Sequence, residues 1–142
     1  MNKQAPFRPE VSTGLVSYEE RFTNEILSLD KSIYGEDRNR ILLEHISDCV
    51  VFKPGQKVEG VYFPSLANGL IIAENPIAGI ELLKQRLQWK DWAIFPKENI
   101  DATNFMNENN FEQVRISRRM LLGKKRIWKP SNIYHRVSGS IG

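Results

Sequence analysis

Residues 94–111, Ile-Phe-Pro-Lys-Glu-Asn-Ile-Asp-Ala-Thr-Asn-Phe-Met-Asn-Glu-Asn-Asn-Phe, are the stretch that decides the fold. The pattern predicts a short buried strand that breaks at Pro96, then a helix, then a second strand that opens at Phe111. Asn99 is a good N-cap, because its side-chain oxygen can accept a hydrogen bond from an unpaired N–H of the first helical turn. Asp101 places a negative charge near the positive end of the helix dipole.

The expected helix in this stretch carries one apolar face and a clear end signal. Ala102, Phe105 and Met106 stand at positions i, i+3 and i+4, so we expect them on one face, with Phe105 buried against the sheet. Asn110 holds the position that glycine usually takes after the last turn, and asparagine tolerates the left-handed conformation of that cap. The stretch therefore predicts a strand–helix–strand unit.

The N-terminal part of the chain predicts an extended arm at residues 1–14, followed by one domain at residues 15–142. A capping box, Ser-Tyr-Glu-Glu at residues 17–20, should start a first helix that ends at Gly35. Asp37 should cap a second helix. The inward-facing positions expected on these two helices are Phe22, Ile26, Leu29, Ile33, Ile41, Leu42, His45 and Ile46.

After these helices the periodicity changes from helical to extended. Asn75 followed by Pro76 predicts a further helix start, since asparagine caps well and proline suits the first helical position. The expected strands lie at residues 48–52, 58–63, 70–73 and 92–95, with a final hairpin over 111–128, and the apolar stripe of the helix should be Ile77, Ile80, Leu83 and Leu87. The sequence therefore predicts an α+β fold with a central, mostly antiparallel mixed sheet flanked by helices.

Composition excludes several classes of protein. A chain of 142 residues is long enough for one domain with its own core. It has no run of about 20 apolar residues that would span a membrane, and no N-terminal signal pattern. Cys49 is the only cysteine and lies among apolar residues, so we expect a buried, inert thiol and a cytoplasmic location. With only His45 and His135 beside it, no structural zinc site is expected.

Charge is distributed unevenly along the chain. Glu112 is the last acid, and eight of the 20 lysines and arginines follow it, which leaves 12 basic residues against 17 acids in the earlier part. A basic tail suits an anionic partner, either a phosphorylated cofactor or a nucleic acid. It equally suits a solvated edge hairpin, where lysine and arginine oppose edge-to-edge pairing.

The order Asn99, Ala102, Phe105 and Asn110-Phe111 resembles the strand–helix–strand core of the GNAT family of acyl-CoA N-acyltransferases. The usual pattern of that family is Asn-x-x-Ala-x-x-(Phe/Leu)-Tyr-x-x-x-Gly-Phe. The chain looks most like the second, C-terminal GNAT-like domain of bacterial tandem GNAT proteins. The further matching segments are Tyr34–Arg38, Ala73–Gly79, Arg118–Met120, and Ile133-Tyr134 followed by Gly139 and Gly142.

This resemblance implies a GNAT-like fold and the transfer of an acetyl group from acetyl-CoA to a small-molecule amine or a peptide. The amine would attack the thioester in a fork between two splayed strands, here residues 70–73 and 92–95. The residues that the resemblance assigns to the cofactor are Ile72 and Ala73 for the acyl carbonyl, Asn75, Ala78, Gly79 and Ile80 for the pyrophosphate, and Asn99 and Phe105 beside the pantetheine arm. Glu59 and Tyr62 are the candidates for catalytic proton transfer.

The chain departs from the family pattern at two positions. Residues 73–79 stand in place of the (Gln/Arg)-x-x-Gly-x-(Gly/Ala) loop whose backbone N–H groups hold the pyrophosphate. Pro76 has no N–H to offer, and Glu74 would stand beside an anion. Met106 replaces the tyrosine that commonly protonates the leaving thiolate, and a thioether cannot donate a proton.

These departures leave two other function classes open. The first is a non-catalytic accessory domain that packs on a catalytic GNAT partner or associates with itself as a homodimer. The second, and the least favoured, is nucleic-acid binding through residues 115–136, which carry charge and Trp128 for stacking but no recognised motif.

Overall fold

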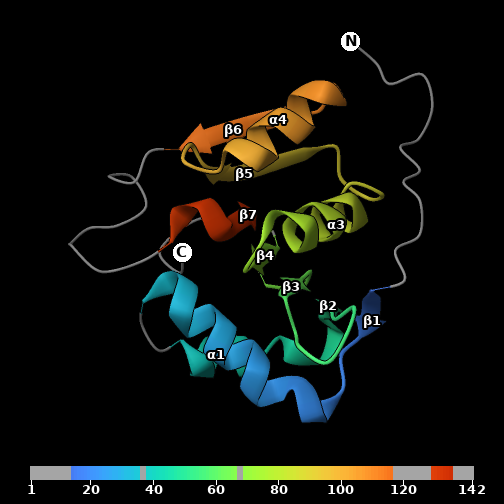
Figure 1. Cartoon of the computed structure of the whole chain (residues 1–142), viewed down its shortest axis with the longest axis vertical. Helices are drawn as coiled ribbons and strands as arrows, with labels where there is room; N and C mark the ends of the chain where they lie inside the picture. The colour runs from blue at the N-terminus through green and yellow to red at the C-terminus, as the bar shows by residue number, and fades with distance from the viewer. Residues whose placement is uncertain (1–13, 36–37, 67–68, 117–128, 136–142) are drawn as a thin grey trace.

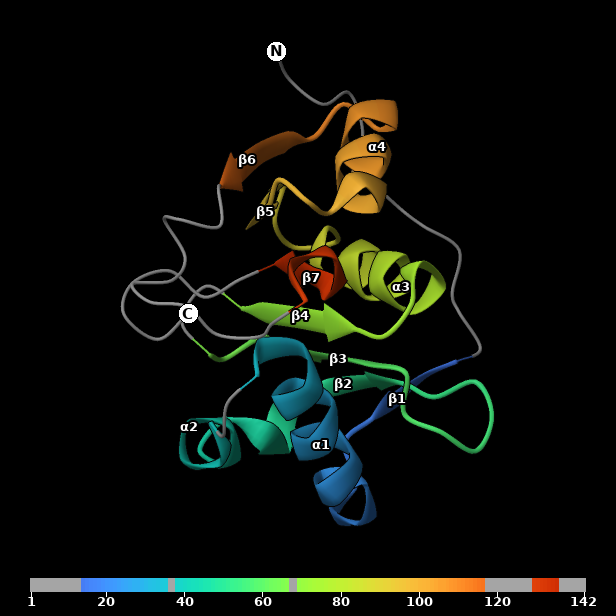
Figure 2. The ribbon, with the colours of Figure 1, turned by 60° about the vertical axis from the view of Figure 1, so that its left-hand side comes forward.

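The computed structural model describes residues 14–35, 38–66, 69–116 and 129–135. In this part of the chain a five-stranded antiparallel sheet, in the order β1-β2-β3-β4-β7, lies beside a parallel pair, β5-β6. Helix α1 covers one face of the larger sheet and α3 the other, while α4 lies against the pair (Figures 1 and 2). This arrangement confirms the predicted α+β class with a mostly antiparallel sheet flanked by helices. The strands are β1 Leu15–Ser17, β2 Val50–Phe52, β3 Gly60–Phe63, β4 Leu70–Ala73, β5 Trp92–Pro96, β6 Glu112–Ile116 and β7 Ile133–His135, and the helices are α1 Thr23–Tyr34, α2 Asn39–Leu43, α3 Pro76–Arg86 and α4 Ile100–Glu108.

Helix α1 has the inward face that its spacing predicts. Ile26, Leu29 and Ile33 are all buried. Gly35 ends the helix in a left-handed conformation, with φ at 78°, and its N–H donates to the carbonyl of Lys31. Glycine suits this position because it has no Cβ to clash at positive φ.

The prediction of a capping box at residues 17–20 is wrong. Ser17 is the last residue of β1, where it pairs with Val50 of β2. The chain then forms a 3-10 turn over Glu20–Phe22, and α1 begins after Phe22 without a side-chain cap. Ser17 does not cap the helix, because its backbone is extended and forms the edge strand of the sheet.

Helix α2 is shorter than the second helix that the sequence predicts. The expected cap, Asp37, lies outside the described residues, and Arg38 stands at the N-cap position. Of the four positions expected to face inward, Leu42 and Ile46 are buried and the other two are only half-buried. Helix α2 therefore contributes less to the core than its spacing suggests.

A buried ion pair connects α1 to the start of α2. The Arg38 guanidinium donates from Nη2 to Oδ1 of Asp30 at 2.7 Å and from Nε to Oδ2 at 3.2 Å. It also lies 3.7 Å above the centre of the Tyr34 ring. Two charged hydrogen bonds compensate for removing both groups from water, which gives Arg38 a structural role.

The centre of the sheet is buried on both faces. Every residue of β3 and β4 is buried, and this explains the uninterrupted apolar run of β4. Strand β4 has the predicted bounds, whereas β2 and β3 each begin two residues later than predicted, as 50–52 against 48–52 and 60–63 against 58–63. The residues that join the α1 core are Val61, Phe63, Leu70 and Ile72, and those that join the α3 core are Tyr62, Ile71 and Ala73.

Cys49 lies in the core on the α1 side of the sheet, as the sequence predicts. Burial, with a smaller effect from the negative charge of Asp48, raises the pKa of the thiol to about 12. The thiolate is the reactive form of cysteine, so the folded protein holds this side chain in its unreactive form at neutral pH.

Helix α3 starts where predicted, and its predicted apolar stripe is confirmed in part: Leu83 and Leu87 are buried and Ile80 is half-buried. The side chain of Asn75 accepts a hydrogen bond from the Ala78 N–H at 2.9 Å, and Pro76 follows at the first helical position. Ile77, expected in the apolar stripe, is instead 70% exposed. The inward face is centred on Ala78 and Leu82, because Gly60 of β3 leaves space for both side chains; a Cβ on Gly60 would lie 2.7 Å from the Leu82 side chain.

Helix α4 has both predicted end signals. Asn99 Oδ1 accepts from the Ala102 N–H at 2.9 Å. At the other end Asn110 adopts φ 61°, its N–H bonds to the carbonyl of Asn107, and the Phe111 N–H bonds to the carbonyl of Met106. This pair of bonds is the Schellman pattern that a left-handed cap closes.

The apolar face of α4 is only partly as predicted. Ala102 and Met106 are fully buried, but Phe105 is half-buried at the margin of the α3 core. The prediction that Phe105 is buried against the sheet is therefore wrong, because the axis of the inward face runs through the i, i+4 pair and leaves position i+3 at its edge.

The last predicted element, the hairpin over 111–128, is described only in part. Strand β6 runs parallel to β5, as expected for two strands joined through a helix. Residues 117–128, with the arginines and lysines at 118, 119, 124 and 125, lie outside the described residues. Within the described part of the chain, no helix has the length and apolar character needed to cross a membrane.

Candidate functional site

The site that the resemblance implies would lie between β4 and β5. In this structure β7 occupies that space (Figure 2). It pairs antiparallel with β4, where Ile72 faces Ile133 and Ile71 faces His135 across a register shift. Among the described strands, β5 pairs only with β6. The two strands that would form the fork are thus separated by a strand of the same chain.

The side chain of His135 connects β7 to β5. Its Nδ1 accepts a hydrogen bond from the Ile94 N–H at 3.1 Å, and its ring packs edge-on against Trp92 with the ring centres 5.4 Å apart. His135 is completely buried. Since Nδ1 accepts here, this nitrogen is unprotonated in the folded state.

Two asparagine side chains fix the start of β7. Asn132 Nδ2 donates to the carbonyl of Ala73 at the end of β4, at 2.7 Å. Asn99 Nδ2 donates to the carbonyl of Ile133 at 2.8 Å, while its Oδ1 caps α4. Asn99 is fully buried, so both ends of its amide are used inside the protein and it faces no solvent-accessible cleft.

Tyr134 fills the space beneath the start of α3. A Cβ built on Gly79 would lie 2.3 Å from the Tyr134 ring, so this contact requires glycine. Burial, and secondarily the charge of Asp101, raises the pKa of the Tyr134 phenol. The predicted pyrophosphate residue Gly79 therefore provides room for an aromatic ring of β7.

The predicted acyl-binding residues lie within the sheet. Ile72 pairs with Val61 on one side and with Ile133 on the other, and the carbonyl of Ala73 accepts from Asn132. Ile72 and Ala73 are both fully buried. Their backbone groups are therefore engaged by protein partners on both flanks of β4.

The start of α3 presents few N–H groups to an anion. Pro76 has none, and that of Ala78 is bound by the side chain of Asn75. Two carboxylates stand beside this helix start: Glu59 Oε1 accepts from Asn75 Nδ2 at 3.0 Å, and Glu74 pairs with a lysine. A pyrophosphate placed here would meet negative charge, which opposes the favourable helix dipole.

The two predicted catalytic residues do not come together. Glu59 is half-buried at the open end of the β3–β4 ladder, where its N–H and carbonyl bond to neighbouring strands. Tyr62 is buried on the α3 side of β3, and burial raises the pKa of its phenol although Arg86 beside it acts in the opposite direction. Of the remaining predicted site residues, Ile80 and Phe105 are half-buried, on α3 and α4.

Sequence reasoning missed the cluster around Arg86. This side chain is only 1% exposed; its Nε donates to the carbonyl of Trp92 at 3.2 Å, and its guanidinium lies 4.7 Å from the Trp92 ring centre. Desolvation lowers the pKa of Arg86, and Tyr62 partly restores it. The position of Arg86 four residues after Leu82, on the inward face of α3, is the signal that would have found it.

Neither a family model, nor a curated protein, nor a solved structure matches this chain. Among the described residues, no three histidine, cysteine, aspartate or glutamate side chains form a group that would hold a metal ion. The most distinctive feature of this region is the packing of β7 between β4 and β5.

Proposed function

We propose that this chain is a non-catalytic, GNAT-like accessory domain, which keeps the plan of an acyl-CoA N-acyltransferase and fills the cofactor fork with its own strand β7. Its role is to pack on a catalytic partner of the GNAT family. The observation that carries the proposal is the position of β7, which pairs with β4 and is hydrogen-bonded through His135 to β5.

Strand β7 is packed firmly between β4 and β5. The residues 133–135 are all buried, and three side-chain hydrogen bonds, from or to Asn99, Asn132 and His135, connect this segment to its neighbours. To admit an acyl chain between β4 and β5, the protein would have to break these bonds and expose the apolar surface of Ile133 and Tyr134. Each buried polar group left without a partner costs about 1–3 kcal/mol.

The N–H groups and charges at the start of α3 support the same proposal. Acetyl-CoA needs free N–H groups and a positive helix end for its pyrophosphate. Here Asn75 takes one N–H, Pro76 lacks one, and Glu59 contributes negative charge nearby. Met106, in place of the usual tyrosine, is buried and has no proton to donate.

The competing hypothesis is an active N-acetyltransferase that uses acetyl-CoA and an amine acceptor. Isothermal titration calorimetry separates the two: we expect no heat when acetyl-CoA is added to about 1 mM, a concentration at the upper end of common enzyme KM values. In parallel, hydrogen–deuterium exchange of residues 70–73 and 133–135 should be the same with and without acetyl-CoA.

A dissociation constant in the micromolar range, together with faster exchange of residues 133–135 in the presence of acetyl-CoA, would show that β7 leaves the fork and would overturn the proposal. The matched control is CoA without the acetyl group. Binding of CoA alone with unchanged exchange at β7 would also contradict it, since it would place a cofactor site elsewhere on the domain.

A further inference from the structure

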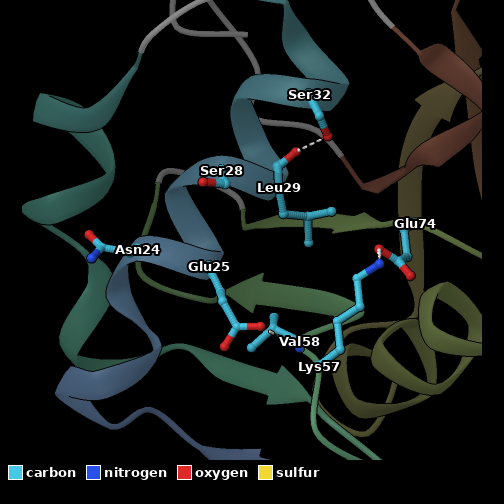
Figure 3. Close-up of a pocket in the computed structure, with 8 residues that line it drawn as sticks. All are labelled: Asn24, Glu25, Ser28, Leu29, Ser32, Lys57, Val58 and Glu74. Carbon is cyan, nitrogen blue, oxygen red and sulfur yellow. Dashed lines mark hydrogen bonds and ion pairs between the residues drawn. The ribbon is translucent and has the colours of Figure 1, made fainter.

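A pocket of about 350 Å³ lies on the other side of the large sheet from α3 (Figure 3). One wall is the side of α1 that carries Glu25, Ser28 and Leu29. The other wall is formed by Lys57 and Val58, just before β3, and by Glu74, just after β4. Because α1 and α3 cover opposite faces of the sheet, this pocket is separate from the space that β7 fills (Figure 2).

The two carboxylates of the pocket come from opposite walls and have different partners. Glu25 Oε2 accepts a hydrogen bond from the Val58 N–H at 3.1 Å, which positions the carboxylate at the pocket. No cation among the described residues forms an ion pair with Glu25. Glu74 is paired with Lys57, with 3.0 Å between Oε1 and Nζ. Within the part of the chain that the structure describes, the lining therefore carries one negative charge without an ion-pair partner.

The most deeply buried residues of the two walls are apolar. Leu29 and Val58 are 8% and 3% exposed and belong to the α1 core, so they form a fixed surface. Ser28 places a hydroxyl on the α1 wall next to it. An apolar surface with a carboxylate at its margin suits a ligand that has a short carbon chain and a positive end.

We propose that this pocket binds a small aliphatic amine, whose ammonium group pairs with Glu25 and whose carbon chain lies on Leu29 and Val58. An anionic ligand would face the net negative lining. A zwitterion would need Lys57 for its carboxylate, but Glu74 already holds that ammonium group. The amine is therefore the ligand class that the charges of the pocket favour.

The test uses n-butylamine as the probe and the full chain labelled with ¹⁵N. We expect millimolar binding in an NMR titration, with the largest shifts at the amides of Ser28, Val58 and Glu74. Butyrate and 1-butanol have the same carbon chain without the positive charge, and they should give no saturable shifts. Equal shifts with 1-butanol would overturn the proposal, since they would indicate an apolar contact alone.

Two substitutions change the charge of the pocket in opposite directions. Glu25→Gln keeps an oxygen to accept from the Val58 N–H but removes the charge, so we expect binding to weaken about fivefold, the scale of one solvent-accessible ion pair. Lys57→Met releases Glu74 from its partner and should strengthen binding by about the same factor. Both variants should keep the wild-type unfolding temperature within about 2 °C, because they alter exposed groups.

Glu44→Gln is the matched control, because Glu44 is exposed and lies after α2, outside the pocket. It should bind n-butylamine as the wild type does. The proposal fails if butylamine gives no shifts up to about 50 mM, a range that covers the weakest specific ligands, or if Glu25→Gln binds as tightly as Glu44→Gln.

Discussion

Two regions meet at the end of β4 and differ in how their polar groups are satisfied. On the side of β5, the carbonyl of Ala73 is bound by Asn132 and the space beyond is filled by β7. One residue later, Glu74 points into an open pocket beside α1, where it holds an exposed lysine (Figure 3). Burial with internal partners removes a site from use by ligands, whereas Glu25 across the pocket, which has no ion-pair partner among the described residues, leaves one available.

The largest effect is expected from removing the aromatic ring of β7. Tyr134→Ala should lower the free energy of unfolding by about 3–5 kcal/mol, because the ring is buried beneath Gly79 and the cavity cannot collapse fully. Chemical denaturation measures the change. Tyr134→Phe keeps the ring and should cost about 1 kcal/mol. A loss below about 1 kcal/mol for the alanine variant would mean that β7 does not fill the space between β4 and β5.

The two capping asparagines should differ because only one of them is buried and holds β7. Asn99→Ala should cost about 2–4 kcal/mol, since it removes the cap of α4 and leaves the buried carbonyl of Ile133 without its donor. Asn75→Ala, at a half-buried cap, should cost about 1 kcal/mol. Equal losses in urea denaturation would show that the bond to β7 adds nothing.

The buried region around β7 should also determine how the stability of the protein changes at alkaline pH. Burial raises the pKa values of Tyr62 and Tyr134 above the ordinary value of 10.0, so the neutral phenols are favoured in the folded state. Their contribution to stability is fully present below pH 10 and is lost as the pH rises through the folded-state pKa values. We expect unfolding to accompany ionisation above pH 10, and Tyr134→Phe to reduce this loss.

Phenolate absorbance near 295 nm, recorded together with circular dichroism, follows both processes in one titration. If both tyrosines ionise near pH 10 in a protein that stays folded, the region around β7 is open to solvent, and the contrast between the two regions disappears.

The smallest effect on stability is expected in the open pocket. Glu74→Gln breaks a pair whose lysine is 67% exposed and whose glutamate is 33% exposed, so the free energy of unfolding should change by less than about 0.5 kcal/mol. Thermal unfolding at low and high salt measures it. A loss above about 1 kcal/mol would mean that this exposed pair supports the fold as the buried contacts of β7 do.

The sequence predicted the candidate site only in part. The residues assigned to the cofactor lie on β4, at the start of α3 and at or on α4. Pro76 and Met106 already weakened the prediction of a phosphate site and of an acid beside the leaving thiolate. No local pattern indicated that residues 133–135 would lie between β4 and β5, or that His135 would be buried there.

The sequence by itself determined those features that depend on a few neighbouring residues. The caps at Asn75 and Asn99, the left-handed turns at Gly35 and Asn110, and the buried run of β4 depend on local backbone conformation and side-chain type. These preferences act before any distant contact forms, so they can be predicted from a short window.

Only the tertiary structure decided which surfaces are closed. The bond from Asn132 to Ala73 spans 59 residues, and that from Ile94 to His135 spans 41. The same kind of distant contact moved Ser17 from a cap into β1 and turned Ile77 outward, because Gly60 on another strand sets which face of α3 fits. Such outcomes depend on complementary packing between segments far apart in the chain, and a local pattern carries no information about it.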